Sequence, residues 1–273
     1  MDGRKYFFLA GLPRSGTTLL SSLLNQNPEI GVSANSFLAD HFYNTAMLNF
    51  DERLVNFPDN NSLNDLISST FDSYYKSWPQ KYIIDKGPWG TPSNLGLLKV
   101  YLQNEIKIVV TVRDIVELIA SWIHLDADRL REELDKDIQN NRRFNESYKS
   151  DIELLCEIVT RPDGQLERYL FSLHNLLKEE NRQYLHLVEY KDLVQSPERT
   201  LRGVYKFLGI DSHNHEYKFI KPFTVNGVKY KDDTLYSKGL HDVRPKLKFP
   251  NYKVKDVLPD YLIKRYSGRE FWR

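Results

Sequence analysis

The chain has 273 residues, enough for one large α/β domain with a sizeable core. Its 38 Lys and Arg residues nearly balance its 37 Asp and Glu residues, which argues against nucleic acid as a partner. Cys156 is the only cysteine, so an internal disulfide framework and a cysteine-based metal cluster are excluded. No run approaches the roughly 18 apolar residues of a membrane span, and we expect a cytoplasmic protein.

The first element is a strand predicted at 5–10, which runs into a glycine-framed loop and then a helix with four leucines on one face. The loop has the Gly11–Gly16 spacing of a nucleoside-triphosphate P-loop. Thr17 replaces the lysine of that loop, and Arg14 supplies a cation inside the loop instead. Because the first N–H groups of a helix lack partners, this junction attracts an anion. The sequence therefore predicts an anion-binding loop for an anhydride other than a nucleoside triphosphate.

The next predicted strand, at 82–85, ends in Asp85-Lys86. Side chains at the carboxyl edge of a parallel sheet point toward the place where such folds bind ligands. Lys86 is therefore a candidate site residue. Asp85 could instead organise Mg²⁺ for an ATP-dependent small-molecule kinase, and this alternative stays open.

A third strand is predicted at 106–112, and a helix at 115–123 follows Asp114 in a capping position. Ser121 lies about two helical turns beyond Arg113, so the two side chains could address one phosphate. The chain then turns highly charged, which predicts an exposed helical excursion at about 126–160 that could close as a lid.

The last predicted strand, at 184–189, precedes Tyr190. A helix follows, with Ser196 as its N-cap and Gly209 at its end. A local basic loop spans 237–246. Strands separated by helices predict a three-layer α/β fold with a mostly parallel central sheet and helices on both faces.

Several of these segments resemble the family of sulfotransferases, which move a sulfuryl group from 3′-phosphoadenosine 5′-phosphosulfate (PAPS) to an acceptor. Residues 13–18 resemble the family's 5′-phosphosulfate loop, and with Asn-Pro-Glu-Ile at 27–30 they are closest to the tyrosylprotein and bacterial branches. The pair Arg113 and Ser121 is similar to the 3′-phosphate motif in spacing and setting. The resemblance implies one domain over 1–273 with the P-loop-like fold of sulfotransferases.

The resemblance also implies the roles of individual residues. Lys86 and Arg14 would be catalytic, stabilising the departing nucleotide, and no metal would be needed. The acceptor is unknown and would be a small molecule, glycan or peptide with a hydroxyl group. The nucleotide contacts implied for PAPS are Arg14, Ser15, Gly16, Thr17, Thr18, Arg113, Ser121, Tyr190, Ser237 and Lys238.

The base that accepts the acceptor's proton is missing from both of its usual places. Gly87-Pro88 follows the lysine where cytosolic members have histidine, and Ala34-Asn35 stands where tyrosylprotein members have glutamate. His41 is the candidate base because an unperturbed imidazole titrates near neutral pH. Asp40, His124 and His241 are alternatives. A catalytically inactive nucleotide-binding protein is therefore a second open function.

Aromatic side chains near these motifs suggest a wall of the acceptor pocket. The expected members are Phe37, Phe42, Trp89 and Trp122.

Overall fold

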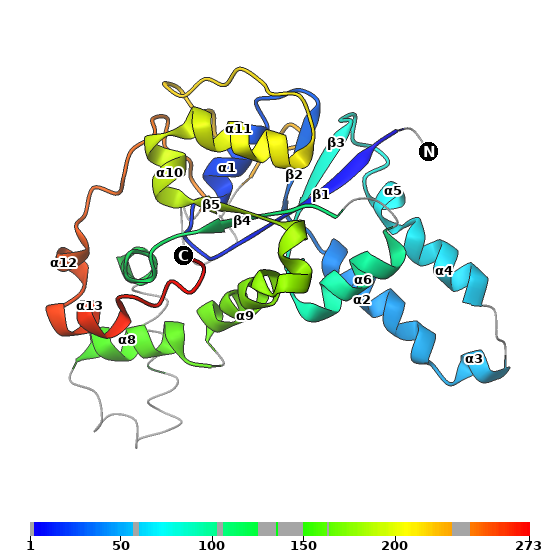
Figure 1. Cartoon of the computed structure of the whole chain (residues 1–273), viewed down its shortest axis with the longest axis horizontal. Coiled ribbons are helices and arrows are strands. Elements are labelled where there is room, and N and C mark those ends of the chain that lie inside the picture. The colour runs from blue at the N-terminus through cyan, green and yellow to red at the C-terminus, as the bar shows by residue number, and fades with distance from the viewer. Residues whose placement is uncertain are drawn as a thin grey trace.

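The computed structural model describes residues 3–56, 60–102, 106–124, 135, 150–162, 164–230 and 241–273 (Figure 1). At its centre lies a five-stranded sheet with the order β2-β3-β1-β4-β5, in which every neighbouring pair is parallel. The strands are β1 (Lys5–Gly11), β2 (Ile30–Asn35), β3 (Tyr82–Lys86), β4 (Ile108–Val112) and β5 (Leu185–Glu189). A separate antiparallel hairpin pairs β6 (Thr224–Val225) with β7 (Val228–Lys229).

Both faces of the sheet are buried, as the alternation of side chains along β1 illustrates. Phe7 and Leu9 pack into one apolar cluster, with leucines of the following helix. Tyr6 and Phe8 point to the opposite face and join the larger cluster. Successive side chains of a strand alternate between faces, so an all-apolar strand needs a helical layer on each side.

The helices form those two layers (Figure 1). One face is covered by α1 (Thr17–Leu24), α10 (Tyr190–Gln195) and α11 (Pro197–Leu208). The other is covered by α2 (Leu38–Met47), α4 (Asn60–Ser68), α5 (Thr70–Tyr74), α6 (Pro92–Tyr101), helix 115–124, α8 (Asp151–Thr160), α9 (Gln165–Leu177) and α13 (Asp260–Tyr266). Shorter helices are η1 (Leu48–Phe50), α3 (Arg53–Asn56), η3 (Glu179–Tyr184) and α12 (Val254–Val257). The expected three-layer α/β architecture is confirmed.

Four of the five strands lie where the sequence predicts them, and β2 was not predicted. The helix after Asp114 is confirmed, and the Asp114 carboxylate accepts from the N–H groups of Val116 and Glu117 at 3.0 and 3.1 Å. Helix α11 ends at Gly209 as predicted, with φ of 68°. The Ser196 hydroxyl makes no capping hydrogen bond, so only its position at the N-cap agrees with the prediction.

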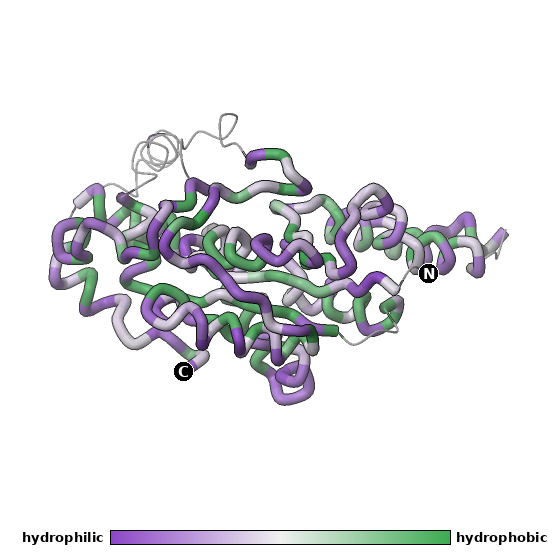
Figure 2. Tube along the Cα trace, turned by 90° about the horizontal axis from the view of Figure 1, so that it is seen from above, coloured by the Kyte–Doolittle hydropathy of each residue, from purple (hydrophilic) through white to green (hydrophobic). Residues whose placement is uncertain are grey.

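Within the predicted charged excursion, only residue 135 and residues 150–160 belong to the described part of the chain. Helix α8 packs into the larger apolar cluster through buried side chains such as Leu155 and Val159. The predicted lid falls on residues outside the described ranges. Helices α3 and α4 project from one end of the molecule, as both views show (Figures 1 and 2). Among the described residues, no helix has the length and apolarity to cross a bilayer.

Candidate nucleotide-binding site

Four adjacent strands deliver the predicted site residues to one edge of the sheet. Lys86 is the last residue of β3, the glycine-framed loop follows β1, Arg113 follows β4, and Tyr190 follows β5. The strands are in parallel register there, with Leu9 opposite Lys86 on one side of β1. Carboxyl ends of parallel strands meet at one edge, so residues far apart in sequence converge.

The loop between β1 and α1 adopts a conformation that requires its two glycines. Gly16 has φ of 86°, and a Cβ there would lie 2.7 Å from Cδ2 of Tyr190. A Cβ on Gly11 would overlap the Thr111 hydroxyl. Arg14 also has a positive φ, of 63°, which is uncommon for a residue with a side chain. The glycines therefore allow the loop to pack directly on β4 and α10.

Two hydroxyls of the loop bond to the sheet, and they do so differently. The Ser15 hydroxyl is fully buried, donates to the Leu12 carbonyl at 2.5 Å, and lies 2.6 Å from the Thr111 hydroxyl. The Thr17 hydroxyl lies 2.8 Å from the same Thr111 oxygen, and Thr17 also lines the cavity beside the loop. Ser15 thus shapes the loop from behind and is not among the described residues that line the cavity.

The N-terminus of α1 faces this cavity without a side-chain cap. Gly16 is its N-cap, and its first turn carries no acidic residue. Gly16, Thr17, Thr18 and Leu19 all line the cavity. The first N–H groups of a helix have no partners within it, and the helix dipole adds partial positive charge. This end of the cavity is therefore suited to an anion.

Arg113 forms the second part of the site and is almost fully buried, with 5% of its surface exposed. Its Nη1 donates to the Arg14 carbonyl at 3.1 Å, and its Nε donates to Glu117 at 3.1 Å. The Tyr190 ring lies under the guanidinium, 4.5 Å from ring centroid to Cζ. Burial raises the pKa of the Tyr190 hydroxyl, so this ring is neutral near pH 7. These contacts fix the direction of the guanidinium.

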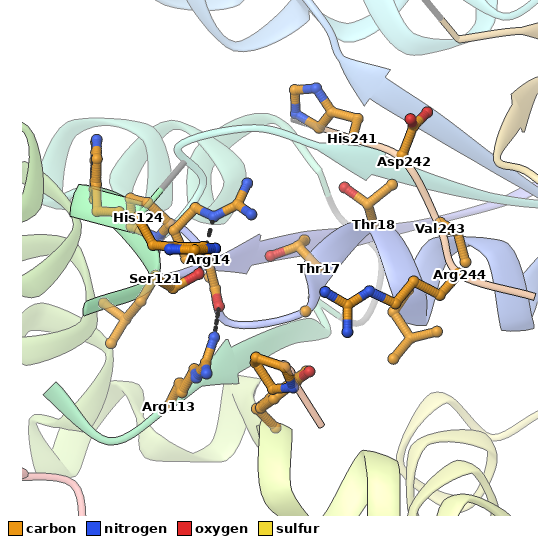
Figure 3. Close-up of a pocket in the computed structure, with 18 of the residues that line it drawn as sticks. Arg14, Thr17, Thr18, Arg113, Ser121, His124, His241, Asp242, Val243 and Arg244 are labelled. Carbon is orange, nitrogen blue, oxygen red and sulfur yellow. Dashed lines mark hydrogen bonds between the residues drawn. The ribbon is translucent and has the colours of Figure 1, made fainter. Parts of the chain in front are cut away.

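Ser121 is the third member of this group. Its hydroxyl accepts from Nε of Arg14 at 3.4 Å, and the close-up shows the hydrogen bonds that link Arg14 to both Ser121 and Arg113 (Figure 3). All three side chains line the same cavity. Arg113 and Ser121, eight positions apart in sequence, thus line one cavity.

The cavity that these elements surround has a volume of about 500 Å³. Its far wall is the stretch from His241 to Tyr252, and Figure 3 shows Arg244 directed toward Thr17 and Thr18. Asp242 is the only acidic residue among the described residues that line it. The lining cations are Arg14, Lys86, Arg113, Arg244, Lys246 and Lys248. A lining of this charge favours a ligand with more than one anionic group.

Lys86 lines the cavity, whereas its neighbour Asp85 does not. Asp85 is fully buried and accepts from the Ser36 hydroxyl at 2.9 Å, from Nε1 of Trp89 at 2.7 Å and from the Tyr75 hydroxyl. Burial raises the pKa of this carboxyl. The two oxygens of Asp85 are thus committed to internal donors, which removes the sequence basis for a Mg²⁺-organising role. Among the described residues, no group of three or more His, Cys, Asp or Glu side chains could hold a metal ion.

The remaining predicted residues do not share one location. His41 is exposed on α2 and is not among the described residues that line the cavity, whereas His124 and His241 do line it. Ser237 and Lys238 fall outside the described residues.

The expected aromatic wall is only partly present. Phe42 and Trp89 are fully buried in the larger apolar cluster, with their ring centroids 6.4 Å apart. They therefore cannot contact an acceptor in the cavity. Phe37 is 78% exposed, and only Trp122 of the four lines the cavity.

Sequence reasoning missed Tyr169, Lys248 and Tyr252, which line the cavity. The alternation of Lys246 and Lys248 was the available signal, because alternate residues of an extended segment share a side. Tyr169 lies on α9, in a stretch that matched no motif.

Comparisons with known proteins give the family. No curated protein matches the chain. The sulfotransferase domain from the curacin biosynthetic pathway is similar over 93% of this chain and 95% of that chain, at 15% identity and a TM-score of 0.47. The sulfotransferase of Alicyclobacillus acidocaldarius is similar over 78% of this chain and 83% of that chain, at 18% identity and a TM-score of 0.48. Mouse sulfotransferase SULT7A1 complexed with PAP is similar over 77% of this chain and 61% of that chain, at 16% identity and a TM-score of 0.46. A family model for the sulfotransferase family matches residues 7–214, and the chain belongs to this family.

Proposed function

We propose that this chain binds PAPS in the cavity and transfers the sulfuryl group to an acceptor hydroxyl. The observation that carries the proposal is the convergence of two separate anion-binding groups on one cavity. The uncapped N-terminus of α1 is one, and the buried Arg113 with Ser121 is the other. A nucleotide with phosphate-type groups at both its 5′ and 3′ positions matches two such groups.

The residues at each end fit the corresponding part of the nucleotide. N–H groups of the first turn of α1, with Arg14, would hold the 5′-phosphosulfate. Arg113 and Ser121 would hold the 3′-phosphate, because a guanidinium fork and a hydroxyl together match phosphate oxygens. Tyr190 would contact the nucleotide from the side of α10.

PAPS supplies an activated sulfuryl group: the bond between sulfur and the bridging oxygen breaks as the acceptor oxygen bonds to sulfur. Lys86, at the end of β3, would stabilise the negative charge that develops on the bridging oxygen. Arg14, in the loop after β1, would assist. The work of this chain is alignment and electrostatic stabilisation, as in phosphoryl transfer.

The proton of the acceptor hydroxyl must pass to a base. The candidates are His41 and Asp40 on α2 and the cavity-lining His124 and His241. Alanine variants of the four separate them, because only loss of the base lowers turnover while affinity for adenosine 3′,5′-bisphosphate is unchanged. An unchanged turnover in His41→Ala would remove His41 from consideration.

Calorimetric titration with adenosine 3′,5′-bisphosphate in EDTA, beside ADP with Mg²⁺, tests the proposal. We expect metal-free binding of the bisphosphate and little response to ADP. The reverse preference would refute the proposal and favour a kinase. Binding without PAPS turnover across a broad panel of acceptors would favour an inactive nucleotide-binding protein.

A further inference from the structure

Residues 270–273, which we call the 270–273 segment, follow α13 and reach back to the edge of the sheet that carries the candidate site. Glu270 Oε1 accepts from the N–H of Ile115 at 2.9 Å. Trp272 Nε1 donates to Glu189 at 3.2 Å. Arg273 donates to both carboxylate oxygens of Glu189, from Nε and Nη2, at 3.2 Å each. The segment is therefore bonded to two separate elements, helix 115–124 and strand β5.

Both bonded positions adjoin residues of the site. Ile115 is the first residue of helix 115–124, two residues after Arg113, and this helix carries Ser121. Glu189 is the last residue of β5 and immediately precedes Tyr190, whose ring supports the Arg113 guanidinium. A shift at either position would change the direction in which these side chains enter the cavity.

The contact with helix 115–124 completes a cap. Asp114 accepts from the N–H groups of Val116 and Glu117, and Glu270 accepts from that of Ile115. The first three N–H groups of the helix are thus bonded, and the first of them is bonded by a residue more than 150 positions away. A carboxylate at a helix N-terminus also interacts favourably with the helix dipole. Glu270 therefore stabilises the start of the helix that holds Ser121.

The contact with β5 combines burial with charge neutralisation. The Trp272 ring is 6% exposed and belongs to the larger apolar cluster, which holds the segment in place. The carboxylate of Glu189 lies beside a site that must attract anions, and the guanidinium of Arg273 offsets its charge. In return, the hydrogen bonds to Glu189 raise the pKa of Arg273.

We infer that Glu270 and Arg273 are positioning residues, which hold Arg113, Ser121 and Tyr190 in the arrangement that binds a nucleotide 3′-phosphate. This inference rests on the proposed function, because it assigns the 3′-phosphate to that group. We therefore expect that replacing either residue weakens only the binding of the 3′-phosphate. Among the described residues, no hydrogen bond or ion pair joins the 270–273 segment to the loop after β1.

The test compares two ligands that differ only in the 3′-phosphate: adenosine 3′,5′-bisphosphate and 5′-AMP. In Glu270→Ala and Arg273→Gln, we expect the bisphosphate to bind about threefold to tenfold more weakly, in the range of mutations that act on a site at a distance. Binding of 5′-AMP should be unchanged. Arg273→Lys, which keeps the charge, should restore part of the affinity.

Arg265→Gln is the matched control. Arg265 lies on α13 and pairs with Glu153 and Glu157 of α8, at 2.9 and 3.1 Å, so its loss removes ion pairs of the same kind away from the cavity. We expect this variant to leave both affinities unchanged, whatever its effect on the melting temperature. Equal losses for the two nucleotides, unchanged bisphosphate binding in both test variants, or the same loss in the control would each overturn the inference.

Hydrogen exchange in the nucleotide-free protein separates a failure of this inference from a failure of the proposed function. Glu270→Ala should speed exchange of the amides at 115–117, whatever nucleotide the cavity binds. If the wild-type protein fails to bind the bisphosphate, the proposed function falls, and exchange still reports on the positioning contact. Unchanged exchange at 115–117 would overturn the positioning role itself.

Discussion

Replacement of Arg113 by lysine should weaken the binding of a 3′-phosphate while leaving the positive charge in place. The guanidinium donates to the Arg14 carbonyl and to Glu117, each at 3.1 Å, and it lies over the Tyr190 ring. These contacts hold the planar group so that its remaining N–H groups are available to a ligand. Lysine has a single nitrogen on a flexible chain and cannot make both protein contacts and a two-point contact with phosphate.

The expected loss follows from the bonds that disappear. A hydrogen bond to a charged group contributes about 1.5–3 kcal/mol, and its loss corresponds to about 10- to 150-fold in affinity. Calorimetry in EDTA should show this loss for adenosine 3′,5′-bisphosphate. For 5′-AMP, which lacks the 3′-phosphate, the change should stay below about threefold, so the coupling between mutation and ligand group isolates the contact.

Arg202→Lys serves as the control for this substitution. Arg202 on α11 pairs with Glu198 at 2.8 Å, and its side chain is 71% exposed. Exposed pairs of this kind contribute little, so both affinities should equal those of the wild-type protein. If Arg113→Lys lowered the affinities for the bisphosphate and for 5′-AMP equally, the assignment of Arg113 to the 3′-phosphate would be refuted.

Three further substitutions test the loop, the core beneath Lys86 and the acid response. Gly16→Ala should lower the free energy of unfolding by about 1–2 kcal/mol from its left-handed backbone alone, and more through the contact with Tyr190; wild-type stability in urea would contradict this. Asp85→Ala leaves the buried donors of Tyr75 and Trp89, and the half-buried Ser36 hydroxyl, without this acceptor. Each buried donor left unpaired costs about 1–3 kcal/mol, and a loss below about 1 kcal/mol in the same assay would argue against that network. Burial lowers the pKa of His215 to about 4, below the usual 6.5, so the unfolded chain binds the proton more readily and stability falls as the pH drops from 6.5 toward 4. In His215→Gln, the free energy of unfolding measured in urea should differ less between pH 7 and pH 4.5 than in the wild-type protein. An unchanged difference would count against a lowered pKa of His215 as the cause.

Most of what the sequence predicts comes from patterns among residues that are close in sequence. The strand, loop and helix around Arg14 follow one another in the chain, so glycine spacing and helical periodicity predict them directly. The eight-residue spacing between Arg113, which directly follows β4, and Ser121, which lies in the next helix, is a local signal of the same kind. The sequence does not predict strand β2, because Gly31 and Ser33 interrupt its apolar run. Its burial depends on pairing with β3, which no local pattern indicates.

The remainder depends on contacts between distant segments. The sequence suggests Trp89 as part of the wall of the acceptor pocket. Its ring is buried in the core instead, and its Nε1–H donates to Asp85. Ser15 lies in the predicted anion-binding loop, but its hydroxyl points back to Thr111. The hydrogen bonds from Arg273 to Glu189 join residues 84 positions apart, and no periodic pattern in the sequence predicts them.

The most direct test of the account is a crystal structure of the protein with adenosine 3′,5′-bisphosphate. The account predicts the 5′-phosphate at the N–H groups of the first turn of α1, with the 3′-phosphate bonded to Arg113 and Ser121. A nucleotide bound outside this cavity, or a 3′-phosphate placed at the α1 loop, would contradict it.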